Sequence, residues 1–323
     1  MATEFNSATA DRPQPAAGET PEKNWASLAG SWEIDGSHLK FKGAGGRGEF
    51  KERFGIARCS NRFRDGTISA QITLSRASRT AAGIAIGFHS INRPYVVLSL
   101  GSFDRAYSIL EFRPEVGWES IDVAGQIQNL QDNHPYAIEI RVEGQKARMT
   151  VDDVDVLDSV LRHPLESTGL CLYAYDTASV SFDKVTLSKV RPKVFVAMPF
   201  REPFDTLYRE VIEPVASELN FEMVRVDEIF GPGIILDDIR RQIASAHVMV
   251  AEVTTPNPNV FYELGYAHAL DKPAILLARR ANGDDLPFDI RGYRVIYYDD
   301  SIGGKKKVDE TLRKHLQAVQ HDF

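Results

Sequence analysis

The sequence predicts two different folds in one chain, an all-β sandwich followed by an α/β unit with a doubly wound, flavodoxin-type parallel sheet. Up to about residue 187, short apolar or alternating runs are separated by turn signals such as Glu143-Gly144, without sustained helical periodicity. That pattern is typical of antiparallel strands packed into two sheets. After a short linker, Ser188–Pro192, apolar runs alternate with helical stretches. Strands that alternate with helices build a parallel sheet with helices on both faces.

The chain has 323 residues, which is enough for two domains with separate hydrophobic cores. Residues 1–24 are rich in Ala, Pro, Thr, Glu and Gly, and we expect a disordered tail there. We expect the sandwich over residues 25–188 and the α/β domain over residues 192–323. Eight strands are predicted in the sandwich: Thr67–Leu74, Ala82–His89, Tyr95–Leu100, Tyr107–Arg113, Tyr136–Val142, Ala147–Val151, Gly169–Tyr175 and Val180–Leu187.

The α/β domain is predicted to contain five strands and four helices. Its strand-like apolar runs are Val194–Met198, Phe221–Val226, His247–Val253, Ala274–Ala278 and Arg294–Tyr298. Helical periodicity is present in Phe204–Leu219, where Pro214 predicts a kink. Further helices are predicted around Ile235–Ile243, from Asn259 onward, and over about Lys306–Ala318.

Composition limits the classes of function that fit this chain. The net charge of −7 gives no electrostatic reason to expect nucleic-acid binding. Cys59 and Cys171 do not form a metal-ligand spacing, so we expect no metal site and a reduced, cytoplasmic protein. The first residues lack the apolar stretch of a signal peptide, and no apolar run approaches membrane-spanning length. We expect no membrane partner and no cofactor.

Segments of Trp25–Leu187 resemble the concanavalin-like jelly rolls, in particular their laminin-G-like branch. The resemblance is carried by Phe63–Gly66, Gly83–Ile86, Tyr95–Leu98, Val142–Asp153, Gly169–Tyr173 and Phe182–Val185. It implies a jelly-roll sandwich that binds a glycan or a protein, or that serves as a structural module. No acidic trio of glycosidase type occurs on one strand of this half, so we expect it to be non-catalytic.

Candidate ligand-binding residues follow the first three strands of the α/β domain, at the edge where open sheets of this kind bind ligands. They are Met198, Pro199, Phe200, Asp227, Glu252, Asn257, Asn259, Tyr262 and Glu263. Carboxylates and amides can bond to sugar hydroxyls, and Phe200 can stack on a flat base, so the set suits a nucleoside-like ligand. A glycine-rich dinucleotide fingerprint and a Walker lysine are absent. His247 and His268 have no evident nucleophile beside them and are interpreted as structural.

The segment Asn257–Leu270 is predicted to be the loop and helix after strand three. We predict Asn259 as the N-cap residue, which places Glu263 in the first helical turn, where the helix dipole favours a carboxylate. Val260 and Leu264 lie on the core-facing arc of this helix, and Glu263 lies on its flank. The simplest interpretation of Glu263 is a surface residue that stabilises the helix dipole. The alternative is a catalytic carboxylate.

Three segments, Lys193–Phe200, Val248–Thr254 and Asn257–Ala267, resemble the nucleoside 2-deoxyribosyltransferase-like superfamily and especially its TIR-like bacterial branch. The resemblance implies cleavage or transfer at the N-glycosidic bond of a nucleoside, a nucleotide or NAD. It assigns the nucleophilic or oxocarbenium-stabilising role to Glu263. The carboxylate after strand three, usually Asp in that superfamily, is Glu252 here. Asp227 and Glu252 are candidates for the acid that protonates the leaving base or directs a hydroxyl.

Two functions therefore stay open. The first is an N-glycosidase (a hydrolase) or deoxyribosyltransferase, in the setting of a bacterial defence effector, with the sandwich sensing or targeting. The second is a non-catalytic, nucleotide-binding sensor with a glycan- or protein-binding jelly roll. Tyr262 and Tyr266 lie one turn apart, away from the core-facing arc, and predict a homo-oligomer. A fragment that starts near Arg191 is expected to keep any activity of the whole chain.

Overall fold

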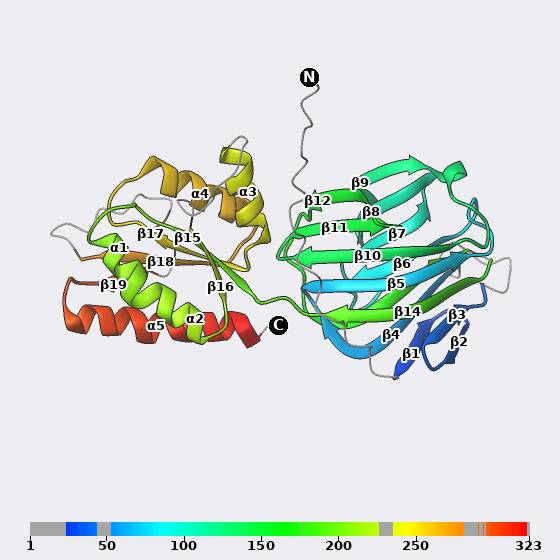
Figure 1. Ribbon diagram of the computed structural model, residues 1–323, viewed down its shortest axis with the longest axis horizontal. Helices are drawn as coiled ribbons and strands as arrows, with labels where there is room; N and C mark the ends of the chain where they lie inside the picture. Colours follow the sequence, from blue (N-terminus) through cyan, green and yellow to red (C-terminus); the bar gives the residue numbers. More distant parts are fainter. Residues whose placement is uncertain are drawn as a thin grey trace, which may run out of the picture.

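The computed structural model describes residues 24–43, 53–176, 178–225, 235–280, 290, 293 and 295–321. Its strands form two seven-stranded sheets and one five-stranded sheet. The two larger sheets, built from β1 to β14, make up what we call the sandwich. The segment from β15 to α5 makes up the α/β unit, which lies beside the sandwich (Figure 1).

The sandwich consists of two antiparallel sheets packed face to face. The strand order is β1-β4-β13-β6-β7-β8-β9 in one sheet and β12-β11-β10-β5-β14-β3-β2 in the other. A short 3-10 helix, η2 (Ile127–Asn129), follows β9. The strands are β1 (Trp25–Ala29), β2 (Trp32–Asp35), β3 (His38–Phe41), β4 (Phe54–Phe63), β5 (Gly66–Leu74), β6 (Ala81–Ile86), β7 (Tyr95–Ser102), β8 (Arg105–Arg113), β9 (Gly117–Gln126), β10 (Pro135–Glu143), β11 (Lys146–Val151), β12 (Val154–Val160), β13 (Thr168–Tyr175) and β14 (Val180–Ser188).

Alternation of side chains builds the core between these two sheets. Along β5, every second residue is buried, and Ile68 and Ile72 face the core. They share that core with Leu98 of β7 and Leu172 of β13 in the opposite sheet. Complete burial of such a side chain contributes about 1.5–3 kcal/mol of hydrophobic stabilisation. The core therefore depends on the period-two pattern that is visible in the sequence.

The eight predicted strands of the sandwich are confirmed, and six further strands were not predicted. Four of the six, β1, β2, β9 and β12, are the edge strands of the two sheets, whose side chains are mostly half-buried or exposed. Strand β4, which lies inside its sheet, was also not predicted, because Arg58 and Arg62 interrupt its run of apolar residues. Their guanidinium groups donate at 2.5 Å to the carbonyl oxygens of Phe88 and Ser167, respectively.

The predicted parallel sheet of the α/β unit is confirmed. Its order is β16-β15-β17-β18-β19, and every neighbouring pair is parallel. In chain order this is 2-1-3-4-5, the flavodoxin-type arrangement. The elements are β15 (Lys193–Ala197), α1 (Phe204–Leu207), η3 (Tyr208–Ile212), α2 (Glu213–Glu218), β16 (Glu222–Arg225), α3 (Ile235–Ser245), β17 (Val248–Glu252), α4 (Pro258–Ala269), β18 (Ala274–Arg279), β19 (Val295–Tyr298) and α5 (Ile302–His321).

Helices cover both faces of this sheet (Figure 1). Residues of α1, η3, α2 and α5 share one core with the sheet, and residues of α3 and α4 share the other. The predicted helix Phe204–Leu219 consists of α1, the π-helical turn η3 and α2. Pro214 sits just after η3 and has no N–H to donate to the preceding turn, which is where helices widen or bend.

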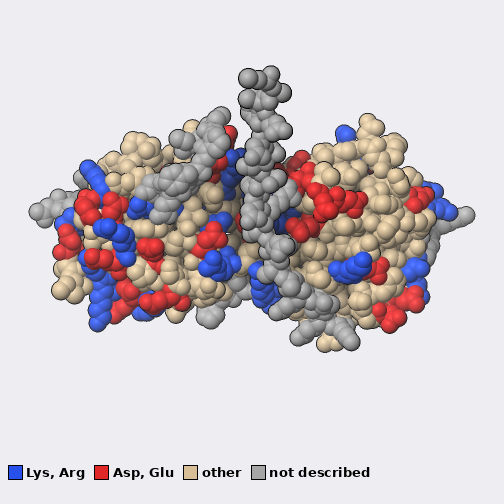
Figure 2. All heavy atoms as spheres, viewed as in Figure 1, with Lys and Arg blue, Asp and Glu red and all other residues tan. Residues whose placement is uncertain are grey.

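Charged side chains of both signs are interspersed over the face of the α/β unit that Figure 2 shows. Among the described residues, no helix is both long and apolar enough to cross a lipid bilayer.

A glycine turn of the sandwich contacts the end of helix α3. The Gln145 N–H, in the turn between β10 and β11, donates to the carbonyl oxygen of Ala244 at 3.0 Å. Gly144 has a φ of 58°, and a Cβ there would lie 2.6 Å from the Ala246 oxygen and 2.8 Å from the Ala244 oxygen. Only glycine allows the turn to approach the helix end this closely.

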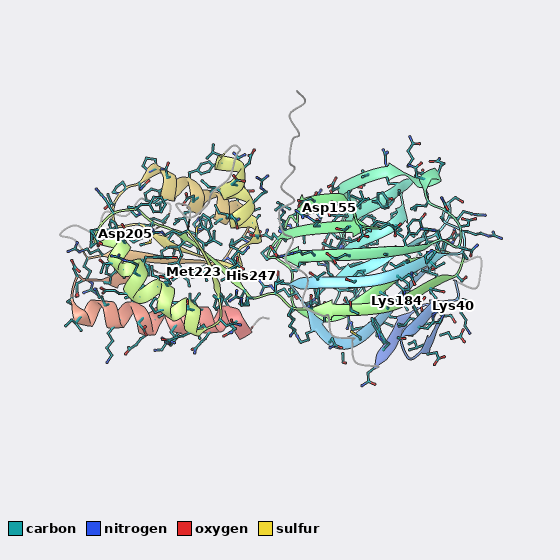
Figure 3. The ribbon with its side chains drawn as sticks, in the orientation of Figure 1. Lys40, Asp155, Lys184, Asp205, Met223 and His247 are labelled. Atoms are coloured by element: carbon teal, nitrogen blue, oxygen red, sulfur yellow. The ribbon has the colours of Figure 1, made fainter. Side chains whose placement is uncertain are left out.

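Asp65 and His247 extend this contact, which we call the interunit contact. Asp65 Oδ1 accepts from the Gly144 N–H at 2.5 Å and lies 3.0 Å from His247 Nε2, and both side chains are buried. His247 Nδ1 accepts from the Lys193 N–H at 2.8 Å, so these partners assign the imidazole proton to Nε2, facing Asp65. In Figure 3, His247 lies at the side of the α/β unit nearest the sandwich.

Lys272 closes the interunit contact from the α/β side. Its Nζ donates to the carbonyl oxygens of Ala244 (3.0 Å) and Ala246 at the C-terminal end of α3. These carbonyls have no partner inside the helix, so the lysine and the Gln145 N–H satisfy them. Burial lowers the pKa of Lys272 to about 7, partly offset by the Asp65 carboxylate.

The depressed pKa makes stability depend on pH in a defined direction. Between about pH 7 and the ordinary lysine value of 10.5, the unfolded chain binds a proton that the folded chain does not. The free energy of unfolding should therefore rise with pH in this window, on the order of a few kcal/mol, relative to Lys272→Met. Urea unfolding at several pH values measures the difference. The exposed Lys314→Met variant should follow the wild type, and an identical pH slope in Lys272→Met would contradict the assignment.

Candidate functional site

Helix α4 begins earlier than predicted. Asn257 is its N-cap residue, with a side-chain oxygen that accepts from the Asn259 N–H at 3.0 Å, and Pro258 occupies the first helical position. Proline suits that position because the N–H it lacks has no partner within the helix. The prediction of Asn259 as the cap is wrong, although the Asn-Pro pair was a readable signal. Glu263 consequently lies in the second turn, and the first turn holds no acidic residue.

Glu263 is a buried carboxyl group whose environment disfavours the charged form. Its side chain belongs to the buried side of α4, together with Val260 and Leu264, and the residue is only 5% exposed. Burial raises the pKa of Glu263 to about 7. The expectation that the helix dipole keeps this group ionised is therefore wrong. The dipole effect fades beyond the first turn, and desolvation dominates.

Glu252 is also buried, but its oxygens are occupied by the protein. It ends β17 and is 1% exposed. Oε1 accepts from the Thr254 hydroxyl and from the Tyr298 hydroxyl at 3.1 Å, and Oε2 accepts from the Thr254 N–H at 3.3 Å. Burial raises the pKa of Glu252, and these hydrogen bonds act in the opposite direction. Thr254 Oγ1 in turn accepts from the Arg279 N–H at 2.6 Å, so the cluster ties together the ends of β17, β18 and β19.

The segment after β15 presents one aromatic ring to solvent. Met198 and Pro199 are buried, whereas Phe200 is 49% exposed. The guanidinium carbon of Arg225 lies 5.3 Å from the centre of the Phe200 ring and 4.5 Å from that of Tyr208. Arg225 Nη1 also lies 2.9 Å from Asp205 Oδ1. The arginine supports the exposed ring from one side through a cation–π contact.

The structure brings some of the predicted site residues together and not others. Asp227 lies outside the described residues. Asn257 uses its side chain as the helix cap, and the exposed Asn259 follows it in the first turn of α4. Within the described chain, no hydrogen bond or ion pair joins Glu252 to Glu263.

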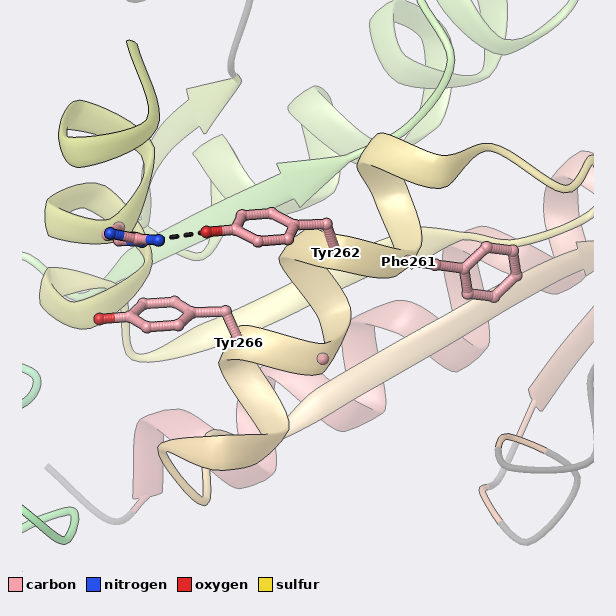
Figure 4. Close-up of a pocket in the computed structure, with 5 residues that line it drawn as sticks. Phe261, Tyr262 and Tyr266 are labelled. Carbon is pink, nitrogen blue, oxygen red and sulfur yellow. Dashed lines mark hydrogen bonds between the residues drawn. The ribbon is translucent and has the colours of Figure 1, made fainter. Parts of the chain in front are cut away.

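Tyr262 lies on the flank of α4 that faces α3. A pocket of about 590 Å³ is lined there by Arg240, Phe261, Tyr262, Gly265 and Tyr266. Arg240 Nε donates to the Tyr262 hydroxyl at 3.0 Å, and both tyrosine rings extend toward α3 (Figure 4). Glu263 does not line this pocket. Self-association through Tyr262 and Tyr266 stays a prediction.

Sequence reasoning missed two residues that shape this region. Tyr298 ends β19 and holds Glu252, and Arg225 ends β16 and holds Phe200. Both are polar residues at the carboxyl end of a parallel strand, which is the signal that drew attention to Asp227 and Glu252. Arg225 was missed because strand two was predicted to continue to Val226, and Tyr298 because the candidates were taken from the first three strands.

No family model matches the chain. Over 85 residues the chain is 35% identical to the 5-hydroxymethyl-dUMP N-hydrolase of Rattus norvegicus, a match that covers 26% of this chain and 52% of the relative. The chain thus spans about half the length of the curated relative it matches.

Solved structures of low sequence identity are similar to about half of the chain. A carbohydrate-binding module from Bacillus subtilis has a TM-score of 0.43 and 16% identity, covering 51% of this chain and 95% of that chain. A Bacillus subtilis protein of unknown function with a galectin-like fold has a TM-score of 0.40 and 12% identity, covering 52% and 90%, respectively. A galectin from Caenorhabditis elegans has a TM-score of 0.31 and 17% identity, covering 39% and 84%.

Burial of Glu263 should cost stability at neutral and alkaline pH. Because its pKa is raised from 4.5 to about 7, the folded chain holds a proton that the unfolded chain releases in that interval. Above pH 7, Glu263→Gln should therefore unfold at a higher temperature than the wild type, and the gain should shrink toward pH 5. Scanning calorimetry at pH 5 and pH 8 measures the difference in melting temperature between Glu263→Gln and the wild type. The exposed Glu213→Gln variant is the control, and equal melting of Glu263→Gln and wild type at pH 8 would refute the assignment.

Proposed function

We propose that the α/β unit cleaves, or transfers a group at, the N-glycosidic bond of a nucleoside or nucleotide, with Glu263 as the reacting carboxylate. The observation that carries the proposal is a buried carboxyl group, with a pKa of about 7, on the helix that follows β17 of a flavodoxin-type sheet. Strongly perturbed carboxyl groups cluster at functional sites. The partial identity with a nucleotide N-hydrolase supports the same reaction class.

The chemistry follows from the charge that develops when the bond breaks. As the C1′–N bond lengthens, positive charge grows on the ribose ring. A carboxylate beside C1′ stabilises this charge or bonds to the carbon. Burial makes ionisation of Glu263 unfavourable. The positive charge that develops on the ribose ring in the transition state stabilises the carboxylate and so offsets this penalty. The attraction is strong because little water screens it.

The other predicted residues take supporting roles in this proposal. The exposed ring of Phe200 stacks on the base, while Met198 and Pro199 shape the wall beneath it. Asn257 and Asn259 place the start of α4 and offer amide groups to sugar hydroxyls. Asp227 remains the candidate acid for the leaving base. Glu252 holds the loop that leads into α4, because both of its oxygens are engaged by Thr254 and Tyr298.

The wider assignment is part of the same proposal. It comprises a jelly-roll domain over residues 25–188 and a nucleoside 2-deoxyribosyltransferase-like domain of TIR-like type over residues 192–323. The tail expected at residues 1–24 lies, except for Asn24, outside the described residues. The jelly roll senses or targets by binding a glycan or a protein. NAD stays among the candidate substrates, alongside nucleosides and nucleotides.

A second candidate is a sensor that binds a nucleotide without turning it over. It is favoured by the state of Glu252, whose oxygens are all occupied by hydrogen bonds from the protein. Three hydrogen bonds from the protein leave this carboxylate little capacity to accept another from a substrate hydroxyl.

A substrate screen separates the two candidates. The full chain is incubated with deoxynucleosides, deoxynucleoside monophosphates including 5-hydroxymethyl-dUMP, ATP and NAD, and the released base is measured by chromatography. We expect release from at least one of them, and a loss of about 10²–10³-fold in turnover for Glu263→Gln. Binding should weaken much less, since the charge matters most as the bond breaks. Glu213→Gln should behave as wild type. Absence of release from every compound would favour the sensor.

The pH dependence of turnover tests the ionisation state of Glu263. The proposed role needs the carboxylate, so kcat/KM, which reports the free enzyme, should rise with pH through about 7 and then level off. If Glu263 instead donated a proton, kcat/KM would fall through the same range. Initial rates of base release at substrate concentrations well below KM, from pH 5 to pH 9, decide between these two directions.

A further inference from the structure

We propose that the sandwich supplies positioning residues for the candidate site, because Asp65 and Gly144 hold the end of α3 and α3 holds the helix that carries Glu263. The inference rests on the proposed function only where turnover is the readout. It assigns to the sandwich a role inside the α/β unit, in addition to any ligand that it binds.

The first step is the end of α3, which is held from outside the helix. The carbonyl oxygen of Ala244 accepts from the Gln145 N–H of the sandwich and from Lys272 Nζ of the α/β unit. The carbonyl oxygen of Ala246 accepts from Lys272 Nζ. Two donors, one from each unit, thus fix the last turn of α3, whose carbonyls would otherwise need water.

The second step concerns the sandwich turn at Gly144 and Gln145, which Asp65 Oδ1 holds in position. Asp65 Oδ1 accepts from the Gly144 N–H at 2.5 Å and lies 3.0 Å from His247 Nε2, at the residue just before β17. The side chains of Asp65 and His247 are each 1% exposed. Removal of one partner would leave a buried polar group uncompensated, which is costly in a site that excludes water. The turn, the start of β17 and the end of α3 therefore move together.

The third step leads from α3 to α4. Ile239 and Ile243 of α3 share a hydrophobic core with Val260 and Leu264 of α4. Arg240 Nε donates to the hydroxyl of Tyr262, the residue directly before Glu263. A displaced α3 would therefore shift the half of α4 in which Glu263 lies. A misplacement of about 1 Å at a reacting group is enough to cost on the order of 10²-fold in rate.

The same contacts change the expectation for a fragment that starts near Arg191. Such a fragment lacks Asp65 and the Gln145 N–H, so His247 loses the carboxylate that faces its Nε2 and the Ala244 carbonyl loses one of its two donors. We now expect it to hold α3 loosely and to lose turnover.

The test compares two glycines with nearly equal φ angles in the full chain. Gly144 has a φ of 58° and Gly36 has a φ of 59°, but a Cβ at Gly36 meets nothing within 4 Å. Gly144→Ala and Gly36→Ala thus carry a similar backbone cost, and only the first pushes on α3. Asp65→Asn is a milder second variant, because its amide oxygen can still accept from the Gly144 N–H.

Hydrogen exchange followed by mass spectrometry measures how well the backbone amides of α3 and α4 are protected. We expect Gly144→Ala and Asp65→Asn to speed exchange in both helices, while β5 and β10 and the Gly36→Ala variant stay as in the wild type. With an active substrate, kcat should fall about tenfold or more with KM within about twofold. Unchanged exchange in α3 and α4, or faster exchange with unchanged kcat, would overturn the proposal. If the wild type releases no base, the exchange result still decides the positioning, and only the proposed function fails.

Discussion

Asp65 Oδ1 lies at the centre of the buried polar contact between an antiparallel sandwich and a parallel α/β unit. It binds the glycine turn of the sandwich and faces the imidazole of His247, and the Gln145 N–H of the same turn donates to the Ala244 carbonyl oxygen. Burial of a charged group is unfavourable unless its oxygens are bonded. This requirement explains why the imidazole proton of His247 faces the carboxylate. Gly144 has a separate reason, because a Cβ there would collide with the carbonyl oxygens at the end of α3, which Lys272 also binds. The α/β unit is completed by the sandwich.

Two glutamates in the α/β unit are buried, but only one of them, Glu252, has hydrogen-bond donors that compensate for the loss of water. Glu252 lies at the end of β17 and is compensated by hydroxyl and N–H donors from Thr254 and Tyr298. It links three strand ends and acts as part of the framework. Glu263 lies on the buried side of α4, and its pKa is raised by desolvation, with no opposing charge among the described residues. Folded proteins tolerate such a cost mainly where function uses it.

The supports of the candidate site reach it from different directions. Phe200 rests on Arg225 at the ends of β15 and β16, and Glu252 ties the loop after β17 to β18 and β19. The start of α4 is capped by Asn257, and its flank is held by Arg240 of α3. Each support acts at the carboxyl ends of the strands or on the helices that follow them. A flavodoxin-type sheet leaves this edge free for a ligand, so rigid supports there can carry a precise geometry.

The sequence by itself determined the two fold classes, because each depends on a short period. Alternation marked Ile68 and Ile72 as core residues of β5, and helical spacing put Val260 and Leu264 on the buried side of α4. It also identified Glu263 and the polar residues at the strand ends. Edge strands such as β9 and β12 escaped, since a strand with few fully buried residues shows little alternation.

Only the tertiary structure decided the environment of those residues. Asp65 and His247 are far apart in the chain, as are Glu252 and Tyr298. No periodic pattern in the sequence predicts that the members of either pair come into contact. The start of α4 at Pro258 moved Glu263 out of the first turn, and burial then reversed the expected direction of its pKa shift. Local patterns report which side of a helix or strand is apolar. The charge state of a carboxyl group depends instead on groups that folding brings together from distant parts of the chain.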